Sequence, residues 1–367
     1  MQASIAALGE TGPTFQARLG ARARAAALIP IVMDLPGLAG AARALTADPS
    51  VEQLEIDGVP ATVTRPAGQG PFPAWVFVTG AHPLRRREPV VQRLAEGLAR
   101  SGYITLIPDL PGLGDGQLTR RTLDAAVAVI EATVARPDVR GRTALVGASA
   151  GASIALLAGA RPELADRISV VAAIAPFADL RKILCLATTR RYEHQGELAD
   201  YEVPTLLRRA VGRSLVAALS ESPEREALLS RLGTIEDEDH DPFDALRHEE
   251  RTAGATAPLI ELFANREPAR FDELYGALPA EVLSVIKELS PLATAGQVRA
   301  PVELAVPPED PYFPSGEARA LADSLPNVRL TVTATLDHTR PMASLRRLGG
   351  LRKFEAFVVR GLAAAAG

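Results

Sequence analysis

The sequence predicts an α/β protein with a mostly parallel central sheet, flanked by helices and interrupted by a long helical insertion. Two observations carry this prediction. Short, continuous apolar runs alternate with segments of helical periodicity over much of the chain. The strand signals stop after Ala175-Pro176 and resume near residue 302. At 367 residues the chain also exceeds the length that one core usually fills.

Two kinds of strand are expected. Residues 51–56 and 61–65 flank Asp57-Gly58, a pair typical of a tight hairpin turn. The next four strands are short, mostly apolar runs, as expected for strands buried on both faces of a parallel sheet, and strand signals resume in two further segments after the insertion. They are residues 74–78, 104–107, 143–146, 168–174, 302–306 and 328–332.

The intervening segments predict helices that cover the sheet. Apolar residues recur at three- and four-residue spacing, which gives repeated strand-helix-strand units and a parallel sheet covered on both sides. Beyond the last strand, a helical tail is expected over residues 342–362. The covering helices are predicted at residues 88–101, 119–135 and 149–160.

The chain is therefore divided into a helical N-terminal arm (1–50), a core domain in two parts (51–177 and 291–367) and a helical insertion (178–290). Within the insertion, Ser222-Pro223 has the pattern of a helix N-cap followed by proline at the first helical position, and Pro279 opens a similar segment. The remainder of the insertion is predicted to be almost wholly helical.

The N-terminal arm contains an apolar run over residues 25–33. Glu10 and the early Asp34 disfavour a secretory signal, and no stretch reaches the ~18 apolar residues of a membrane span. The arm is expected to lie on the core domain or to touch a membrane surface lightly.

Composition excludes several classes of function. The net charge is −4 and the basic residues are spread along the chain, which disfavours a nucleic-acid partner. Cys185 is the single cysteine and cannot form an internal disulfide, so a reducing, cytoplasmic compartment is expected. No Cys/His spacing resembles a zinc site. The acidic run 236–241 lacks the glycine and the final glutamate of a calcium loop, so it is interpreted as a solvated linker. No metal or other cofactor is expected.

A candidate nucleophile lies in Gly147-Ala148-Ser149-Ala150-Gly151, a G-x-S-x-G pattern between a predicted strand and a predicted helix. A serine at the tip of such a turn has strained backbone dihedrals, and the small residues on either side let strand and helix pass closely. The turn would also direct the Ala150 N–H toward a developing oxyanion. The alternative is that Ser149 merely caps the helix.

This motif and two further loops resemble those of the α/β-hydrolase superfamily, and the resemblance covers residues 50–367. Thr79-Gly80-Ala81-His82-Pro83, after the strand at 74–78, is similar to the superfamily's oxyanion loop. The segment 108–116 is similar to its D-x-P-G-x-G turn. The resemblance makes Ala81 the second oxyanion donor. Because the loop lacks the common histidine-glycine pair, His82 stays an alternative.

The resemblance also implies a catalytic acid after the strand at 302–306, where it selects Asp310. Glu309 competes, because Pro307-Pro308 replaces the usual glycine-bearing turn. Asp179 is a further alternative, although it is better interpreted as the cap of the first helix of the insertion.

His338 is the expected general base, because it follows the strand at 328–332 and precedes the final helix. The chain order serine, acid, histidine is that of the superfamily. His82 is better placed beside the oxyanion site. The remaining histidines lie in the insertion; they are His194, His240 and His248.

The resemblance implies a serine hydrolase that cleaves a carboxylic ester through an acyl-enzyme, with a small-molecule acyl ester as its substrate. Within the superfamily, the chain is most similar to the esterase and dienelactone-hydrolase-like members. Thioester or amide cleavage and acyl transfer are alternatives, as is a binding protein without turnover. The insertion is expected to cover the site and to govern substrate choice, with residues 203–219 and 259–263 as its roof.

Overall fold

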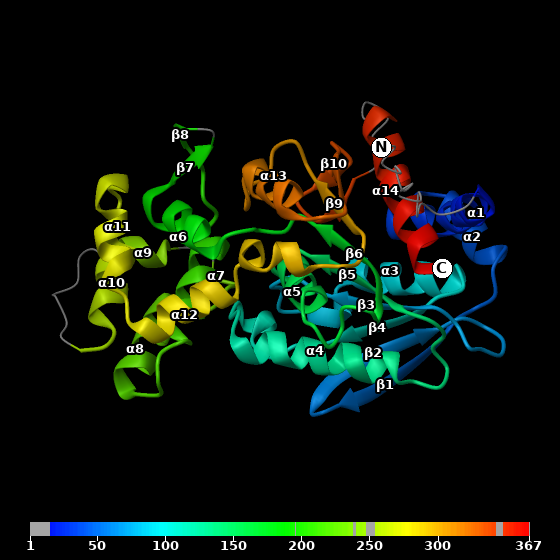
Figure 1. Ribbon diagram of the computed structural model, residues 1–367, viewed down its shortest axis with the longest axis horizontal. Coiled ribbons are helices and arrows are strands. Elements are labelled where there is room, and N and C mark those ends of the chain that lie inside the picture. Colours follow the sequence, from blue (N-terminus) through cyan, green and yellow to red (C-terminus); the bar gives the residue numbers. More distant parts are fainter. Residues whose placement is uncertain (1–14, 195, 238–239, 247–253, 343–347, 367) are drawn as a thin grey trace, which may run out of the picture.

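The computed structural model describes residues 15–194, 196–237, 240–246, 254–342 and 348–366. Its centre is an eight-stranded sheet with the order β1-β2-β4-β3-β5-β6-β9-β10 (Figure 1). The first two strands are antiparallel to each other, β2 is antiparallel to β4, and all later pairs are parallel. This arrangement confirms the predicted fold class. The strands are β1 (Ser50–Ile56), β2 (Val59–Arg65), β3 (Ala74–Val78), β4 (Ile104–Pro108), β5 (Thr143–Ala148), β6 (Ile168–Ile174), β9 (Val302–Val306) and β10 (Val328–Val332).

The hairpin between β1 and β2 is tighter than predicted. Asp57 and Gly58 both have positive φ, 49° and 77°, as a two-residue turn requires. Ile56 therefore pairs directly with Val59, and β2 begins two residues before the predicted start at Ala61.

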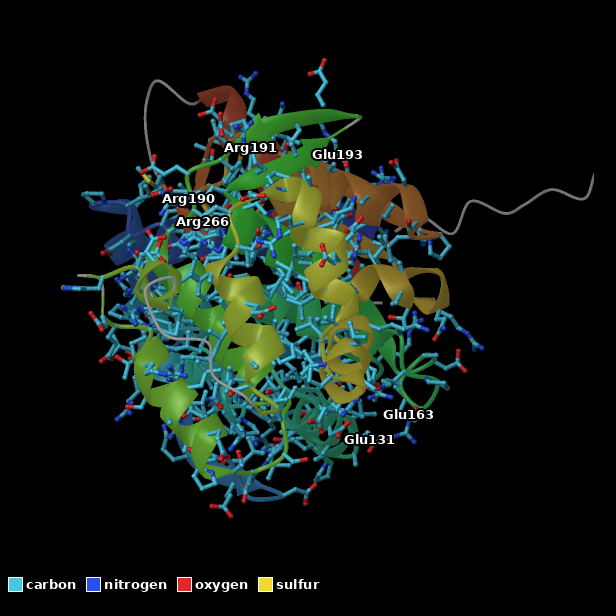
Figure 2. All side chains as sticks on the ribbon, turned by 90° about the vertical axis from the view of Figure 1, so that its left-hand side faces the viewer. Glu131, Glu163, Arg190, Arg191, Glu193 and Arg266 are labelled. Carbon is cyan, nitrogen blue, oxygen red and sulfur yellow. The ribbon has the colours of Figure 1, made fainter. Side chains whose placement is uncertain are left out.

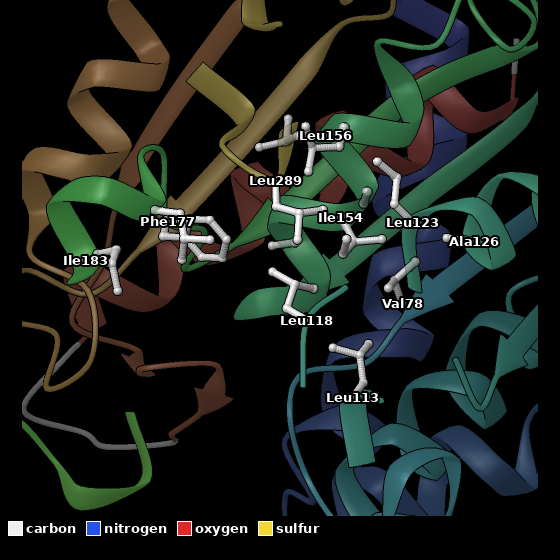
Figure 3. Packing of buried hydrophobic residues seen from close by; sticks show 14 of the residues in the cluster. Val78, Leu113, Leu118, Leu123, Ala126, Ile154, Leu156, Phe177, Ile183 and Leu289 are labelled. Atoms are coloured by element: carbon white, nitrogen blue, oxygen red, sulfur yellow. The ribbon is translucent and has the colours of Figure 1, made fainter. Parts of the chain in front are cut away.

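Alternate residues of the parallel strands face two different hydrophobic clusters. One face, which includes Val76, Val78 and Leu145, packs against α4 (Arg120–Val134) and α5 (Ala150–Gly159) (Figure 3). This cluster continues past Phe177 into the insertion, where Ile183 and Leu289 belong to it. The opposite face, with Trp75, Phe77 and Val146, packs against α1 (Phe15–Val32), α3 (Pro89–Arg100) and α14 (Leu348–Ala366).

The N-terminal arm lies on this second face. Its helix α1 contacts α3 and α14, and the three helices lie together at one side of the sheet in Figure 1. A Cβ added at Gly97 would lie 2.6 Å from Leu28 Cδ1, so glycine permits the close approach of α3 to α1. The second helix, α2 (Leu38–Ala44), is tied to α3 by paired hydrogen bonds from Arg43 to Glu96, at 2.8 and 2.9 Å. No helix of the described residues is long and apolar enough to cross a membrane.

The insertion leaves the sheet after β6 and returns at β9, forming a separate lobe in Figure 1. As predicted, Asp179 caps α6 and Ser222 caps α8, each accepting a hydrogen bond from a backbone N–H of the first turn. The helices are α6 (Leu180–Thr189), α7 (Thr205–Val216), α8 (Pro223–Leu232), α9 (Pro242–Leu246), α10 (Ala257–Ala264), α11 (Pro268–Gly276) and α12 (Ala280–Glu288).

The expectation of an almost wholly helical insertion is wrong in one place, since β7 (Arg191–His194) and β8 (Glu197–Asp200) form an antiparallel hairpin. Arg190 ends α6 in the left-handed conformation, with φ 57°, and Gly196 has a φ of 84° at the hairpin turn. These two positions redirect the chain in a segment that lacks an obvious strand pattern.

The acidic run 236–241 is also not simply a solvated linker. Asp241 forms ion pairs with Arg190, at 2.9 Å, and with the fully buried Arg208. Arg190 also pairs with Asp244, which pairs in turn with Arg266; Arg190 and Arg266 lie beside each other in Figure 2. Burial lowers the pKa of Arg208 to about 10, so its guanidinium stays charged at neutral pH and requires such a partner. Residues 238 and 239 lie outside the described residues.

A buried carboxylate joins the start of the insertion to α13 (Ser315–Ser324). Glu317 accepts hydrogen bonds from the N–H groups of Ala178 and Asp179, at 2.7 and 2.9 Å, and from the Tyr192 hydroxyl at 2.9 Å. Its side chain is fully buried, and this burial raises the pKa of the carboxyl above its ordinary value.

This raised pKa predicts a pH-dependent stability. The folded protein holds the Glu317 proton more tightly than the unfolded chain does, so the free energy of unfolding should fall as the pH rises above the ordinary pKa of 4.5. We expect the urea midpoint of the wild type to decrease between about pH 5 and about pH 8. The urea midpoint of Glu317→Gln, a variant that keeps an acceptor for the two N–H groups, should decrease less over the same pH range. Equal slopes in the two proteins would contradict the assignment.

Candidate active site

The serine of the G-x-S-x-G pattern occupies a strained turn between β5 and α5. Ser149 has φ 55° and ψ −129°, a left-handed conformation that a residue with a side chain adopts only when its surroundings impose it. Its N–H donates to the Ile174 carbonyl of β6 at 2.9 Å. The serine side chain makes no capping hydrogen bond to α5, so the alternative that Ser149 merely caps the helix is wrong.

The two glycines of the pattern are required by backbone contacts. A Cβ at Gly147 would lie 2.4 Å from the Gly151 carbonyl oxygen. A Cβ at Gly151 would lie 2.2 Å from the Thr79 carbonyl oxygen, at the end of the neighbouring strand. Since rigid backbone atoms make both contacts, any larger residue would push helix and strand apart and displace the serine between them.

The other nearby serine has a structural role. Ser153 is fully buried in α5, where its hydroxyl donates to the Phe177 carbonyl at 2.9 Å and accepts from the Phe177 N–H at 3.1 Å. These bonds tie α5 to the segment that follows β6. Ser153 is therefore unavailable as a nucleophile.

The loop after β3 contacts the serine turn. A Cβ at Gly80 would lie 3.2 Å from both the Ser149 Cβ and the Ala148 carbonyl oxygen. Among the described residues, the backbone N–H groups of Ala81, His82 and Ala150 have no hydrogen-bond partner. The Ala150 N–H is in the first turn of α5, where no intrahelical acceptor exists. Free amides thus border Ser149 on two sides, and Ala150 with Ala81 remains the predicted oxyanion pair.

The histidine and the acid meet directly. The Nδ1 atom of His338 lies 3.0 and 2.9 Å from the two carboxylate oxygens of Asp310. Asp310 is 6% exposed, and its Oδ1 also accepts from the N–H groups of Tyr312 and Phe313, at 2.8 and 3.0 Å. Glu309 is exposed, so it is Asp310 that the structure brings to the histidine.

Aromatic rings and a tight turn hold the histidine in place. His338 has φ 50° at the tip of a hairpin between β11 (Leu336–Asp337) and β12 (Arg340–Pro341). The Tyr312 ring is centred 4.5 Å from the imidazole, and the Phe313 ring packs against it edge-on at 5.7 Å. The turn that presents Asp310 therefore also supplies the packing that limits rotation of His338.

One contact to the site comes from the insertion. The Tyr201 hydroxyl donates a hydrogen bond to the backbone carbonyl of Asp310. Burial and the nearby Asp310 carboxylate both raise the pKa of Tyr201, so the phenol stays protonated and can donate. No local sequence pattern predicts this contact, because 109 residues separate the two groups.

Ser149 and His338 border the same cavity, whose volume is about 420 Å³. Gly80, Ala81 and His82 lie at this catalytic end. Of the described part of the insertion, only Leu206 in α7 reaches the cavity wall. His240 does not line it, and the side chains of His194 and His248 lie outside the described part of the structure.

The expectation that residues 259–263 roof the site is wrong. These residues lie in α10, where Leu259, Leu262 and Phe263 are fully buried inside the insertion. The Phe263 ring stacks on Phe243 at 4.7 Å. The apolar stripe of α10 is thus covered by its own lobe, and α7 is the helix that reaches the cavity.

Comparison with known proteins gives one family match and several similar solved structures. Residues 57–252, just over half of the chain, match the model of a family described as X-Pro dipeptidyl-peptidase (S15 family). No curated protein matches the chain. Similar solved structures include 2,6-dihydroxy-pseudo-oxynicotine hydrolase, with 16% identity over 89% of this chain and 71% of that one, at a TM-score of 0.46. Dipeptidyl peptidase 4 of Porphyromonas gingivalis shows 15% identity over 89% of this chain and 37% of that one, at a TM-score of 0.49.

An esterase of Pyrococcus furiosus is similar at 14% identity over 87% of this chain and 92% of that one, with a TM-score of 0.48. The extent of the family match, together with the mostly parallel sheet, decides the assignment. The chain belongs to the X-Pro dipeptidyl-peptidase (S15) family and is a serine hydrolase of the α/β-hydrolase superfamily.

Proposed function

We propose that the protein hydrolyses a small-molecule carboxylic ester, with Ser149, His338 and Asp310 as its catalytic triad. The observation that carries the proposal is the hydrogen-bonded pair of His338 and Asp310 at the same cavity as the strained Ser149. Nucleophilic acyl transfer requires a buried acid, an oriented imidazole and a serine whose hydroxyl is not used to cap a helix.

The reaction follows from these parts. His338 takes the proton of Ser149 through its Nε2 as the serine oxygen attacks the ester carbonyl. Asp310 holds Nδ1 and stabilises the imidazolium, while the N–H groups of Ala150 and Ala81 donate to the oxyanion. His338 then protonates the departing alcohol, and water repeats the sequence to release the acid. Each oxyanion donor contributes roughly 3 kcal/mol to the transition state.

The character of the cavity supports an ester. Its walls are mainly apolar, and the charged or titratable side chains that reach it lie near the catalytic end. An uncharged acyl group can enter such a space without losing hydrogen bonds to water. A neutral ester also carries no terminal charge, so the cavity needs no side chain of opposite charge to bind it.

A second candidate, removal of an Xaa-Pro dipeptide, is favoured by the activity after which the matching family is described. An aminopeptidase of this kind needs an acidic side chain to pair with the substrate's terminal ammonium group. Glu88 and Asp337 are the carboxylates that line the cavity, and Glu88 already has Arg340 at 3.6 Å. Glu88 would have to exchange this partner for the substrate.

A substrate panel with one variant separates the two candidates. We expect p-nitrophenyl butyrate to be turned over, with Ala-Pro-p-nitroanilide a far poorer substrate by kcat/KM. Glu88→Gln should leave the KM for the butyrate ester nearly unchanged under the ester proposal. If the dipeptide anilide is the better substrate and Glu88→Gln raises its KM, the peptidase assignment replaces the ester assignment.

A further inference from the structure

The cavity at Ser149 continues well behind the catalytic end. Its wall includes Trp75 and Phe77 of β3, Val146 of β5 and Ala172 of β6. In each strand the lining residues are two apart, so they all project from one face of the sheet. The pairs are Trp75 and Phe77, Val146 and Ala148, and Ala172 and Ile174. This is the face covered by α1, α3 and α14, not the face covered by α4 and α5.

Three helices form the opposite wall. The N-terminal arm contributes Leu28 and Val32 of α1, and α3 contributes Leu94. The final helix contributes Phe357 and Leu362. Among the described residues that line this inner part, which we call the acyl channel, none carries a charged side chain.

The space around Gly361 indicates room for a ligand in the acyl channel. Gly361 is buried in α14, yet a Cβ added there would have a single heavy atom within 4 Å, Cη2 of Trp75 at 3.5 Å. Protein interiors are normally packed closely, as Gly97 against Leu28 shows on the same face.

The strands give the length of the acyl channel. Trp75 pairs with Ala144, which lies five residues before Ser149 in the chain. At about 3.3 Å per residue, Trp75 lies on the order of 17 Å from Ser149 along the strand direction. The volume of about 420 Å³ is within the range of small-molecule sites. An apolar and uncharged space of this length and volume fits an extended hydrocarbon chain.

We propose that the acyl channel binds the unbranched acyl chain of a medium- or long-chain ester, with the chain end near Trp75; this inference rests on the proposed function. Ala148 and Ile174 line the channel where it meets the serine turn, so the group bonded to Ser149 is the one that can enter. The leaving alcohol receives its proton from His338, on the side where Leu206 and Thr339 border the cavity.

Chain-length kinetics test the acyl channel. In the wild type, kcat/KM for p-nitrophenyl esters should rise about fourfold per added methylene from acetate upward, until the channel is filled. Gly361→Leu should reduce the dodecanoate-to-acetate ratio of kcat/KM roughly 100-fold, the effect of three to four lost methylenes. The matched control is Gly349→Leu, at an exposed site of the same helix with no atom near its Cβ, which should leave the ratio unchanged.

Alkyl acetates of increasing alcohol length form the complementary series. Their kcat/KM should show a weaker dependence on length than the acyl series. A flat acyl series, or a steeper dependence on the alcohol, would overturn the acyl channel while leaving ester hydrolysis by Ser149 intact.

A binding measurement tests the acyl channel without turnover. Trp75 is the single tryptophan of the chain, so its fluorescence reports on ligands in the channel. With Ser149→Ala protein, 12-bromododecanoic acid should quench Trp75 more strongly than 2-bromododecanoic acid. Equal quenching, or stronger quenching by the 2-bromo acid, would overturn the proposed orientation. Selective quenching by the 12-bromo acid in a protein whose wild type hydrolyses no ester would support the channel and reject the proposed function.

Discussion

Replacing Ser149 with alanine is expected to lower kcat for p-nitrophenyl butyrate by about 10⁴- to 10⁶-fold, the range found when the nucleophile of a serine triad is removed. His338 then has no hydroxyl to activate, although the cavity and the oxyanion amides remain. The fold should survive, because the serine side chain caps no helix and alanine bears a similar strain at φ 55°. Initial rates and the thermal midpoint of the purified variant measure both effects.

Ser153→Ala is the matched control, since it removes a hydroxyl four residues away in the same segment. It should retain reaction with a fluorophosphonate, although loss of the bonds to Phe177 should destabilise the protein by about 1–3 kcal/mol. If Ser149→Ala retained wild-type turnover, or if Ser153→Ala alone abolished labelling in a folded protein, Ser149 would not be the nucleophile.

Asp310→Asn is expected to lower kcat by about 10⁴-fold, as for triads that lose their carboxylate. The neutral amide cannot stabilise the imidazolium, and its NH₂ group, if it faces Nδ1, selects the wrong tautomer of His338. The N–H groups of Tyr312 and Phe313 can still donate to the side-chain oxygen, so the turn should keep its shape. The measurement is kcat of the variant and the wild type over the pH range in which the wild type is active.

Glu309→Gln tests the neighbouring acid with the same change of charge. Glu309 is exposed and Asp310 is buried against the imidazole, so the glutamine variant should keep wild-type kcat. A larger loss for Glu309→Gln than for Asp310→Asn would mean that Pro307-Pro308 shifts the register of the turn and that Glu309 is the acid.

Much of the fold could be predicted because its signals are local. The strands at 74–78, 168–174, 302–306 and 328–332 have the predicted bounds. The first two are unbroken, mainly apolar runs that are buried on both faces of the sheet. The serine turn could also be predicted, because its glycines are required by close contacts within a few residues and with the adjacent strand.

Features that depend on distant partners could not be predicted. The apolar face of α10 shows that the helix is buried, but not that Phe243 covers it rather than the active site. The ion pair of Arg208 with Asp241 and the bond from Tyr201 to Asp310 join segments far apart in the chain. The acyl channel depends on where α1 and α14 pack, which periodicity alone does not specify.

The most direct test of the central claim is to label the wild-type protein with a fluorophosphonate and to locate the adduct by peptide mass spectrometry. The account predicts one phosphonylated residue, Ser149, in the peptide that spans the G-x-S-x-G turn, with labelling strongly reduced in His338→Ala. No adduct in the folded protein, or an adduct on another residue, would contradict the account.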